Sequence, residues 1–201
     1  MEFRLLGWPG DDVVLRLDHR AYAYAGKFAM STTGKAVALD ADGAGDDPAE
    51  FAVPAEPKRE YVDPAAVVAF SADRTDPDAL WLRYVSVRRG RRGDGVGPRL
   101  CRFVVGRAAE RGYERVRIAV NNAYSYEALY KVGFAWTGRE TGIAELVLER
   151  PAEEPAALDP AAYREGLATI AARDDVGDGE RAFAERKRER GPPDVVDGGG
   201  E

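Results

Sequence analysis

The sequence is poor in several residue types, and each shortage excludes a class of protein. It contains one cysteine, Cys101, so the chain cannot form an internal disulfide. It contains one histidine, His19, which removes most metal sites and most histidine-dependent catalytic triads. No apolar run reaches the roughly 18–20 residues of a membrane span, and the N-terminus lacks the apolar core of a signal peptide. We therefore expect a cytoplasmic protein with no membrane contact and no bound metal.

Lysine is also scarce, although the chain is highly charged. There are 29 basic and 35 acidic residues, which give a net charge of -6. Only five of the basic residues are lysines: Lys27, Lys35, Lys58, Lys131 and Lys187. Excess acid and a preference for arginine are typical of GC-rich genomes and of a high-salt cytoplasm. The acidity argues against general nucleic-acid binding, which needs a broad basic face.

The apolar patterns predict a mixed α/β domain over residues 1–150, with hydrophobic residues at 45 % of the chain as its core. We expect strands at 3–8, 35–40, 65–72, 79–87 and 114–121, helices at 98–111 and 125–132, and a terminal hairpin from 134–138 and 143–150. A helix or two is expected within 11–28, and an acidic loop insert at 41–63. Alternation in the strand 79–87 predicts one face made of Leu80, Leu82, Tyr84 and Ser86.

The chain changes character after Arg150, and residues 151–201 are expected to be a C-terminal extension. Asp159 and Pro160 make a good cap and first turn for a short helix at about 160–172. From Asp174 onward the chain is charged and rich in glycine. That composition predicts a disordered tail.

The stretch "VSVRRGRRGDGVGPRL", residues 85–100, places five arginines and four glycines just after an apolar strand. A helix that begins near Pro98 would present unpaired N–H groups and a partial positive charge at its start. Glycines let a phosphate approach the backbone closely, and the arginines add positive charge. The stretch therefore predicts a polyphosphate site, with a solvated arginine-rich turn as the alternative. It fits neither the P-loop pattern nor the spacing of a dinucleotide-binding loop.

Two motifs resemble the GNAT family of N-acetyltransferases. Residues 92–97 match the pattern Arg/Gln-x-x-Gly-x-Gly/Ala of the family's acyl-coenzyme A pyrophosphate loop. Residues 120–134 are similar to its strand-to-helix segment and include the hexapeptide "LYKVGF" at 129–134. Both motifs occur in family order and at family spacing, and the resemblance covers about residues 65–149.

The resemblance implies a fold and a cofactor. The fold would be a central, twisted mixed sheet with helices on both faces, in which two parallel strands, 79–87 and 115–121, splay apart. Acetyl-CoA would enter the gap. Its pantetheine arm would bind the backbone near Val85 and Val87, and Asn121 or Asn122 would lie beside it. Its pyrophosphate would bind the backbone of the loop: Arg92, Gly93, Asp94, Gly95, Val96 and Gly97.

The resemblance also implies a catalytic residue. Tyr130 occupies the position of the family's general acid, which protonates the departing sulfur; the alternative is a tyrosine that only packs on the sheet. The family's strand glutamate is missing, and Arg83 stands near its place. The base would then be a water relay, Glu127, or a group from the N-terminal half, unless the amine arrives neutral. Arg83 could instead bind an acidic acceptor. Spacing alone predicts that Glu127 and Lys131 form a surface ion pair.

The predicted function is transfer of an acetyl group from acetyl-CoA to a primary amine of a small molecule or protein, by direct attack in a ternary complex. The alternative is an acyl-CoA-binding sensor or complex subunit that keeps the fold without catalysis. A nucleic-acid binder that uses the arginine loop is a third reading, which the acidity of the chain disfavours. The acceptor and the oligomeric state, a homodimer included, stay open.

Overall fold

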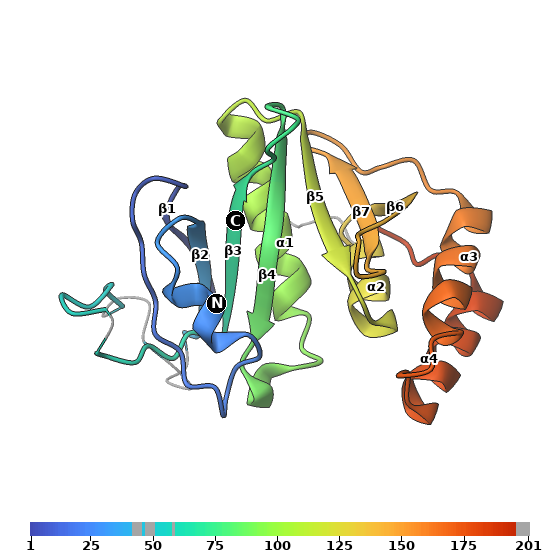
Figure 1. The fold of residues 1–201 in the computed structure, drawn as a ribbon, viewed down its shortest axis with the longest axis horizontal. Coiled ribbons are helices and arrows are strands. Elements are labelled where there is room, and N and C mark those ends of the chain that lie inside the picture. The colour runs from blue at the N-terminus through green and yellow to red at the C-terminus, as the bar shows by residue number, and fades with distance from the viewer. Residues whose placement is uncertain (42–45, 47–50, 58, 196–201) are drawn as a thin grey trace. The chain divides into compact units, whose positions relative to one another are not determined.

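The computed structural model describes residues 1–41, 46, 51–57 and 59–195. The chain forms two compact units, Met1–Arg107 and Ala108–Glu201. Both contain strands and helices (Figure 1), so the predicted α/β class is confirmed. No helix in the described ranges has the length and apolar character needed to cross a membrane.

The N-terminal unit contains four antiparallel strands that pair in chain order. They are β1 (Glu2–Gly7), β2 (Gly34–Leu39), β3 (Ala66–Ala72) and β4 (Ala79–Val87). Each lies within one residue of its predicted position. β2 and most of β3 are buried on both faces, which explains their nearly continuous apolar sequences.

A β-bulge on β4 corrects the predicted strand face. Tyr84 pairs with Ala69 of β3, whereas Leu82 pairs with the next residue, Phe70, so Arg83 is the extra residue. Because Ala69 and Phe70 point to opposite faces, Leu82 and Tyr84 do too. The prediction that they share a face was wrong, since plain alternation assumes a strand without a bulge.

The helix after the glycine-rich loop is α1 (Val96–Glu110), which begins two residues earlier than predicted. A short 3₁₀ turn, η2 (Arg89–Arg91), precedes it. The apolar stripe of α1 is buried as expected and includes Cys101, whose side chain is 1 % exposed. Burial raises the pKa of the Cys101 thiol to about 12, so this cysteine is a core residue and a poor nucleophile.

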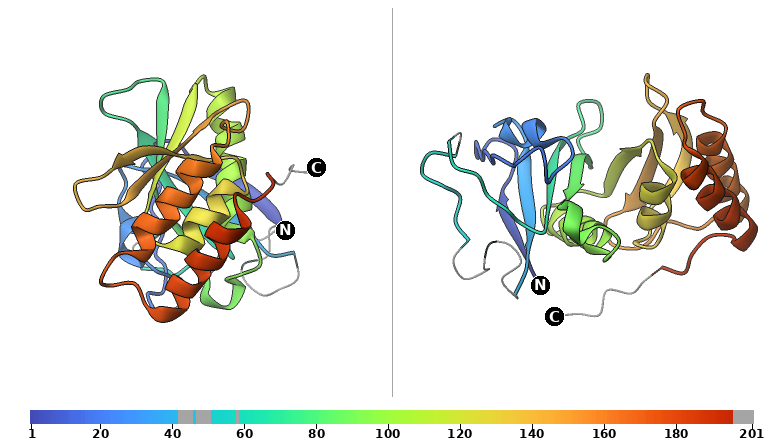
Figure 2. Two further views of the ribbon diagram at one scale, coloured as in Figure 1. Left: turned by 90° about the vertical axis from the view of Figure 1, so that its right-hand side faces the viewer. Right: turned by 90° about the horizontal axis from the view of Figure 1, so that it is seen from below.

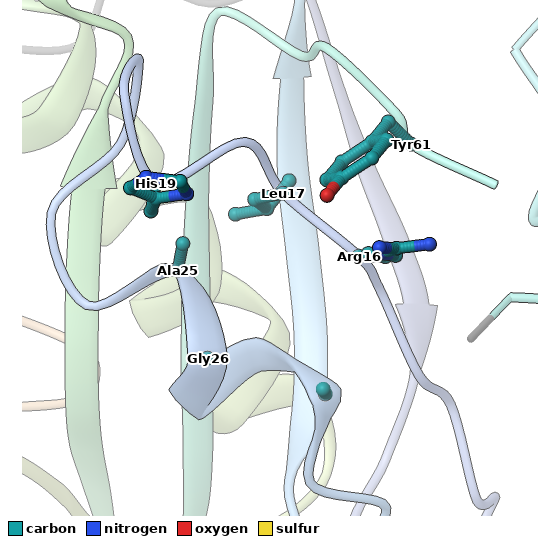
Figure 3. A pocket seen from close by; sticks show the side chains of 7 residues that line it. Arg16, Leu17, His19, Ala25, Gly26 and Tyr61 are labelled. Atoms are coloured by element: carbon teal, nitrogen blue, oxygen red, sulfur yellow. The ribbon is translucent and has the colours of Figure 1, made fainter. Parts of the chain in front are cut away.

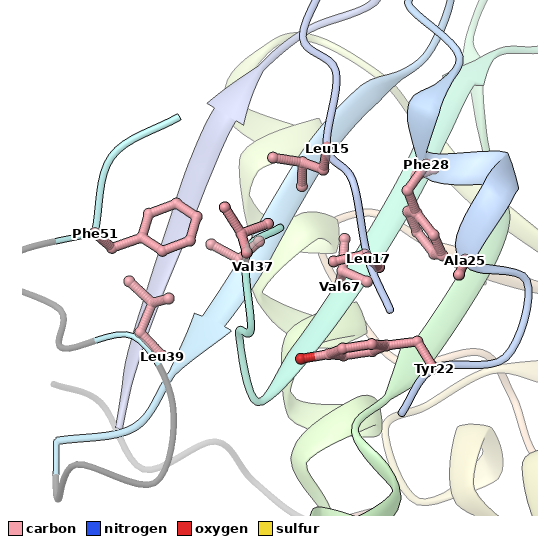
Figure 4. Close-up of a cluster of buried hydrophobic side chains, with 11 residues drawn as sticks. Leu15, Leu17, Tyr22, Ala25, Phe28, Val37, Leu39, Phe51 and Val67 are labelled. Atoms are coloured by element: carbon pink, nitrogen blue, oxygen red, sulfur yellow. The ribbon is translucent and has the colours of Figure 1, made fainter. Parts of the chain in front are cut away.

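The helices expected within 11–28 are largely absent, because local hydrogen bonds favour an irregular path. The Asp18 carboxylate accepts from the Arg20 N–H at 2.9 Å, and the only helical element described there is a 3₁₀ helix, η1 (Ala25–Ala29). The segment covers one face of the sheet with Leu15, Leu17 and Phe28, which join a buried cluster with residues of β2 and β3 (Figure 4).

Lys35 fixes this irregular segment to β2. Its side chain is fully buried, and its ammonium group donates to the carbonyls of Val13, Met30 and Thr33 at 2.6, 2.7 and 2.9 Å. Burial lowers the pKa of Lys35 to about 8, so the ammonium form predominates at neutral pH and can donate three hydrogen bonds.

Replacing Lys35 by methionine is expected to lower the free energy of unfolding by about 2 kcal/mol or more, because one buried and two partly buried carbonyls lose their donor. Lys27→Met is the matched control, because Lys27 is an exposed lysine on the irregular segment that Lys35 holds. Chemical denaturation measures both. Equal stability of the two variants would show that Lys35 does not hold the segment.

The C-terminal unit contains three antiparallel strands in the order β5-β7-β6. Its elements run β5 (Arg115–Val120), α2 (Ala123–Tyr130), β6 (Ala135–Glu140) and β7 (Leu146–Pro151). The predicted strand, helix and terminal hairpin are therefore confirmed. The predicted insert at 41–63 lies partly outside the described residues, and its described part carries no helix or named strand.

The C-terminal extension contains two helices, α3 (Pro160–Ala171) and α4 (Asp178–Arg190). The first is confirmed, with the Asp159 carboxylate capping it through the Ala161 N–H at 2.8 Å. The predicted disorder from Asp174 was wrong for residues 178–190. α2, α3 and α4 contact one another and lie side by side (Figure 2), so the extension is an integral part of its unit.

Candidate active site

The glycine loop, residues 88–97, has two positions with a backbone that only glycine adopts readily. Gly93 and Gly95 have φ angles of +93° and +72°, in the left-handed region. A Cβ atom at either position would meet nothing within 4 Å, so the space above this backbone is open. At Gly97, in contrast, a Cβ would lie 3.0 Å from the Val87 side chain. Gly97 therefore allows the start of α1 to pack closely on β4.

The loop presents a row of free backbone donors. Within the described part of the chain, no acceptor pairs with the N–H groups of residues 93–97. The first regular contact beyond them is the Arg99 N–H, which donates to the Gly95 carbonyl at 3.3 Å. Successive free N–H groups at a helix start favour an anion. Five predicted cofactor residues, Gly93 to Gly97, thus form a continuous stretch of backbone donors without a partner in the described residues.

Two of the loop's arginines brace it rather than point to solvent. The buried carboxylate of Asp40, at the end of β2, receives Arg91 at 2.7 Å and Arg88 at 3.3 Å. Arg88 also pairs with Asp63 at 2.8 Å. The sequence analysis missed Asp40, because a single acid after an apolar strand does not indicate its partner. Three other arginines of the stretch are exposed and have no carboxylate partner among the described residues, although Arg92 donates from Nε to the Val87 carbonyl at 3.4 Å: Arg89, Arg92 and Arg99.

The predicted pantetheine residues lie on β4, next to the loop. Val85 and Val87 are both half-buried, and their side chains face the start of α1 at Gly97. Arg83 is exposed, donates from Nε to the Ser71 hydroxyl at 2.8 Å, and lies 5.0 Å from the Trp81 ring. β4 therefore carries an arginine and no carboxylate where the family pattern has its glutamate.

The two predicted asparagines, in the C-terminal unit, have different roles. Asn122 caps α2, because its side-chain oxygen accepts from the Ser125 N–H at 2.8 Å. The Asn121 side chain is exposed and accepts from the Asn122 amide at 3.1 Å. Of the two, Asn121 is therefore the one with an amide available to a ligand.

Tyr130 lies at the end of α2 and is 1 % exposed. Its hydroxyl accepts from the Trp136 N–H at 2.9 Å and lies 3.1 Å from the hydroxyl of Tyr126. Burial raises the pKa of Tyr130, and these two hydrogen bonds partly offset that increase. The hydroxyl is therefore protonated at neutral pH, as an acid must be, and is firmly positioned.

Comparison with known proteins identifies the family. Residues 19–134 match the model of the acetyltransferase (GNAT) family, which is more than half of the 201 residues. The chain belongs to the GNAT family. Membership supports acyl transfer as the activity of this chain, and the resemblance predicted from the two motifs is confirmed.

Solved structures similar to this chain are distant in sequence. Nourseothricin acetyltransferase is 20 % identical, with 75 % of this chain and 98 % of that chain covered and a TM-score of 0.49. A GCN5-related N-acetyltransferase from Kribbella flavida is 22 % identical, with 59 % and 67 % covered and a TM-score of 0.43. YncA from Salmonella typhimurium, solved with its cofactor acetyl-CoA, is 15 % identical, with 63 % and 69 % covered and a TM-score of 0.45. No curated protein matches the chain in a sequence search.

Glu127 is buried, contrary to the predicted surface pair with Lys131. It is 3 % exposed, and its carboxylate accepts from the Tyr163 hydroxyl and from the Lys187 ammonium, the latter at 2.6 Å. Spacing along one helix suggested Lys131, but the partners come from the extension. Because both carboxylate oxygens are engaged, Glu127 is a poor candidate for the catalytic base.

A shallow pocket of about 330 Å³ in the N-terminal unit is lined mainly by the segment 16–29 (Figure 3). The Arg16 guanidinium lies 4.1 Å from the ring of Tyr61, and the His19 side chain is 84 % exposed. These groups give the pocket positive or neutral walls. In the described residues, no cluster of acidic, histidine or cysteine side chains is arranged to hold a metal ion.

Proposed function

We propose that this protein transfers an acetyl group from acetyl-CoA to a primary amine of a small molecule or protein, by direct attack in a ternary complex. The observation that supports it most strongly is the row of free N–H groups from Gly93 to Gly97. Backbone donors at a helix start, below open space and beside exposed arginines, suit a pyrophosphate. Family membership agrees with that ligand class.

The residues of the loop would hold the cofactor by its phosphates. Gly93 to Gly97 would supply free backbone donors, whereas the Arg92 N–H would first have to leave the Arg89 carbonyl, 3.4 Å away. Arg89, Arg92 and Arg99 would supply positive charge from their side chains. Val85 and Val87 would offer strand-like backbone groups to the pantetheine arm, with Asn121 or Asn122 beside it. Bound acetyl-CoA supplies the acetyl group and a thiolate that can leave.

The chain's own chemistry would act at two places. Backbone N–H groups near Val85 are the candidates for stabilising negative charge on the acetyl oxygen, where one donor is worth about 3–4 kcal/mol. Tyr130 would donate its hydroxyl proton to the departing sulfur. A positioned acid or base contributes roughly 10²–10⁴-fold to the rate.

The acceptor amine must lose a proton without help from a β4 carboxylate, because none is present. Glu127 is occupied by Tyr163 and Lys187. The remaining routes are a water relay, a base from the N-terminal half, or an amine that arrives neutral. Primary amines have pKa values near ~10, so the last route predicts a rate that increases with pH until the amine is deprotonated.

Calorimetric titration with acetyl-CoA, followed by a screen of primary amines for free-thiol release, tests the proposal. We expect one-to-one binding that persists in molar salt, because backbone donors as well as surface arginines hold the phosphates. We also expect at least one amine to accelerate thiol release. Folded protein that fails to bind acetyl-CoA at low and at high salt would refute the assignment.

A second candidate, an acyl-CoA sensor without catalysis, is favoured by the burial of Tyr130, whose hydroxyl is already hydrogen-bonded to the Trp136 N–H. The same titration and screen separate the two functions. A sensor binds acetyl-CoA but releases no thiol with any amine, whereas an acetyltransferase does both.

A further inference from the structure

The hydroxyl of Tyr126 is the only described side-chain group within hydrogen-bond distance of the Tyr130 hydroxyl. The two oxygens are 3.1 Å apart, and the rings of these two α2 residues are tilted at a centroid distance of 4.8 Å. Tyr126 is completely buried. Its hydroxyl also lies 3.3 and 3.4 Å from the carbonyl oxygens of Tyr163 and Ala162 in α3.

The hydrogen-bonding capacity of these groups allows two arrangements. Each hydroxyl has one proton, and carbonyls only accept. In the first, Tyr130 donates to Tyr126, and Tyr126 donates to the Tyr163 carbonyl. In the second, Tyr126 turns its proton to Tyr130, whose own proton is then free for another acceptor. The Trp136 N–H donates to the Tyr130 oxygen in both.

We propose that Tyr126 is a positioning residue for Tyr130, and that its hydroxyl donates to the Tyr130 oxygen when Tyr130 loses its proton. This inference rests on the proposed function. The proton passes from Tyr130 to the departing sulfur, and the proton shed by the acceptor nitrogen returns through water. The resulting tyrosinate then has two donors, the Trp136 N–H and the Tyr126 hydroxyl. Hydrogen bonds to the charged form stabilise it and strengthen the acid.

The C-terminal extension determines where this second donor lies. A methyl group at Gly166 of α3 would overlap the Tyr126 hydroxyl, so only glycine leaves room for it. The Tyr163 ring packs edge-on against Tyr130 with centroids 4.8 Å apart. α3 thus gives the Tyr126 hydroxyl both its space and its alternative acceptors. A segment predicted to lie outside the domain thereby acts on the proposed acid.

Three phenylalanine variants of the full chain test the proposal: Tyr126→Phe, Tyr163→Phe and Tyr130→Phe. Thiol release from acetyl-CoA is measured with the fastest amine of the screen, or with water as acceptor where no amine accelerates it. We expect Tyr126→Phe to lower kcat about 10- to 100-fold, the effect of losing one hydrogen bond to a charged group. The KM for acetyl-CoA should not change. The high-pH limb of the kcat profile should move upward, because the tyrosinate loses a donor.

Tyr163→Phe is the matched control. It removes a buried hydroxyl from the same cluster, but that hydroxyl contacts Glu127 and not Tyr130. It should lower stability while leaving kcat and the high-pH limb unchanged. Gly166→Ala, which displaces the Tyr126 hydroxyl without removing it, should reproduce the kinetic effect of Tyr126→Phe.

The outcomes separate this inference from the proposed function. If Tyr130→Phe lowers kcat and Tyr126→Phe behaves like Tyr163→Phe, the role of Tyr126 is overturned and that of Tyr130 stands. If Tyr130→Phe retains full turnover, both roles are overturned, whatever Tyr126→Phe does.

Discussion

Replacing Gly95 by glutamate is expected to weaken acetyl-CoA binding at least 100-fold while the protein stays folded. Gly95 has a φ of +72°, so a glutamate there is strained by roughly 1–2 kcal/mol. The new side chain would fill the open space above the loop and place a negative charge at a row of anion donors. Charge repulsion and lost access act together on the phosphates. Calorimetry measures the affinity, and thermal unfolding verifies the fold.

Two further variants separate charge from strain. Gly90→Glu adds the same charge to the same loop, at an exposed glycine without a left-handed φ and without a close neighbour. Gly95→Asn keeps the left-handed backbone, which asparagine tolerates, and adds no charge. We expect both to bind acetyl-CoA more tightly than Gly95→Glu. Wild-type affinity in Gly95→Glu would remove the loop from the binding site.

Replacing Lys187 by methionine is expected to lower the free energy of unfolding by about 3–5 kcal/mol, because it leaves the buried Glu127 carboxylate without its cation. The size of the effect follows from burial: Glu127 is 3 % exposed, so water cannot replace the ammonium group. Chemical denaturation of the full chain measures this change in the free energy of unfolding.

Lys131→Met is the matched control, because helix spacing alone assigns Lys131 as the partner of Glu127. Its effect should stay within about 0.5 kcal/mol, as for most surface substitutions. Adding Glu127→Gln to Lys187→Met should recover much of the loss, since the unpaired charge is gone. Equal stability of the Lys187 and Lys131 variants would contradict the assigned pair.

The sequence predicted local structure well where one regular pattern governed a segment. The apolar strands β2, β3 and β4 were found as short apolar runs, and the stripe of α1 was found because burial of one face imposes period 3.6 on its residues. Prediction from sequence failed in the segment 11–28 and at Arg83 of β4. In the first segment, Asp18 and Lys35 bind backbone groups directly. At Arg83 a bulge shifts the alternation, and no pattern of residue types marks it.

In the candidate site, too, some features were predicted from sequence and others were not. The glycine loop was found from sequence, because a left-handed backbone and close packing both require glycine, and glycines can be recognised directly in the sequence. The partners of the charged residues were not found. Asp40 meets Arg91, and Glu127 meets Lys187, across 51 and 60 residues of sequence. Helix spacing offered Lys131 instead, since it considers only neighbours on one element.

The C-terminal extension shows most clearly where prediction from sequence fails. Its charge and glycine content satisfied the criteria for disorder, and of α4 only Ala184 is buried. Contacts to both α3 and α2 hold α4. Toward α2, Glu180 accepts from the Ala123 N–H at 2.8 Å, the ring centroids of Phe183 and Tyr124 are 4.6 Å apart, and Lys187 pairs with Glu127. Sequence alone was enough to predict the family, the glycine loop and the helix that carries Tyr130, because each depends on residues close together in the chain. The surroundings of Tyr130 became visible only in the folded structure. Hydrogen bonds and ion pairs depend on distance in space, and residues far apart in the sequence can be neighbours in the fold.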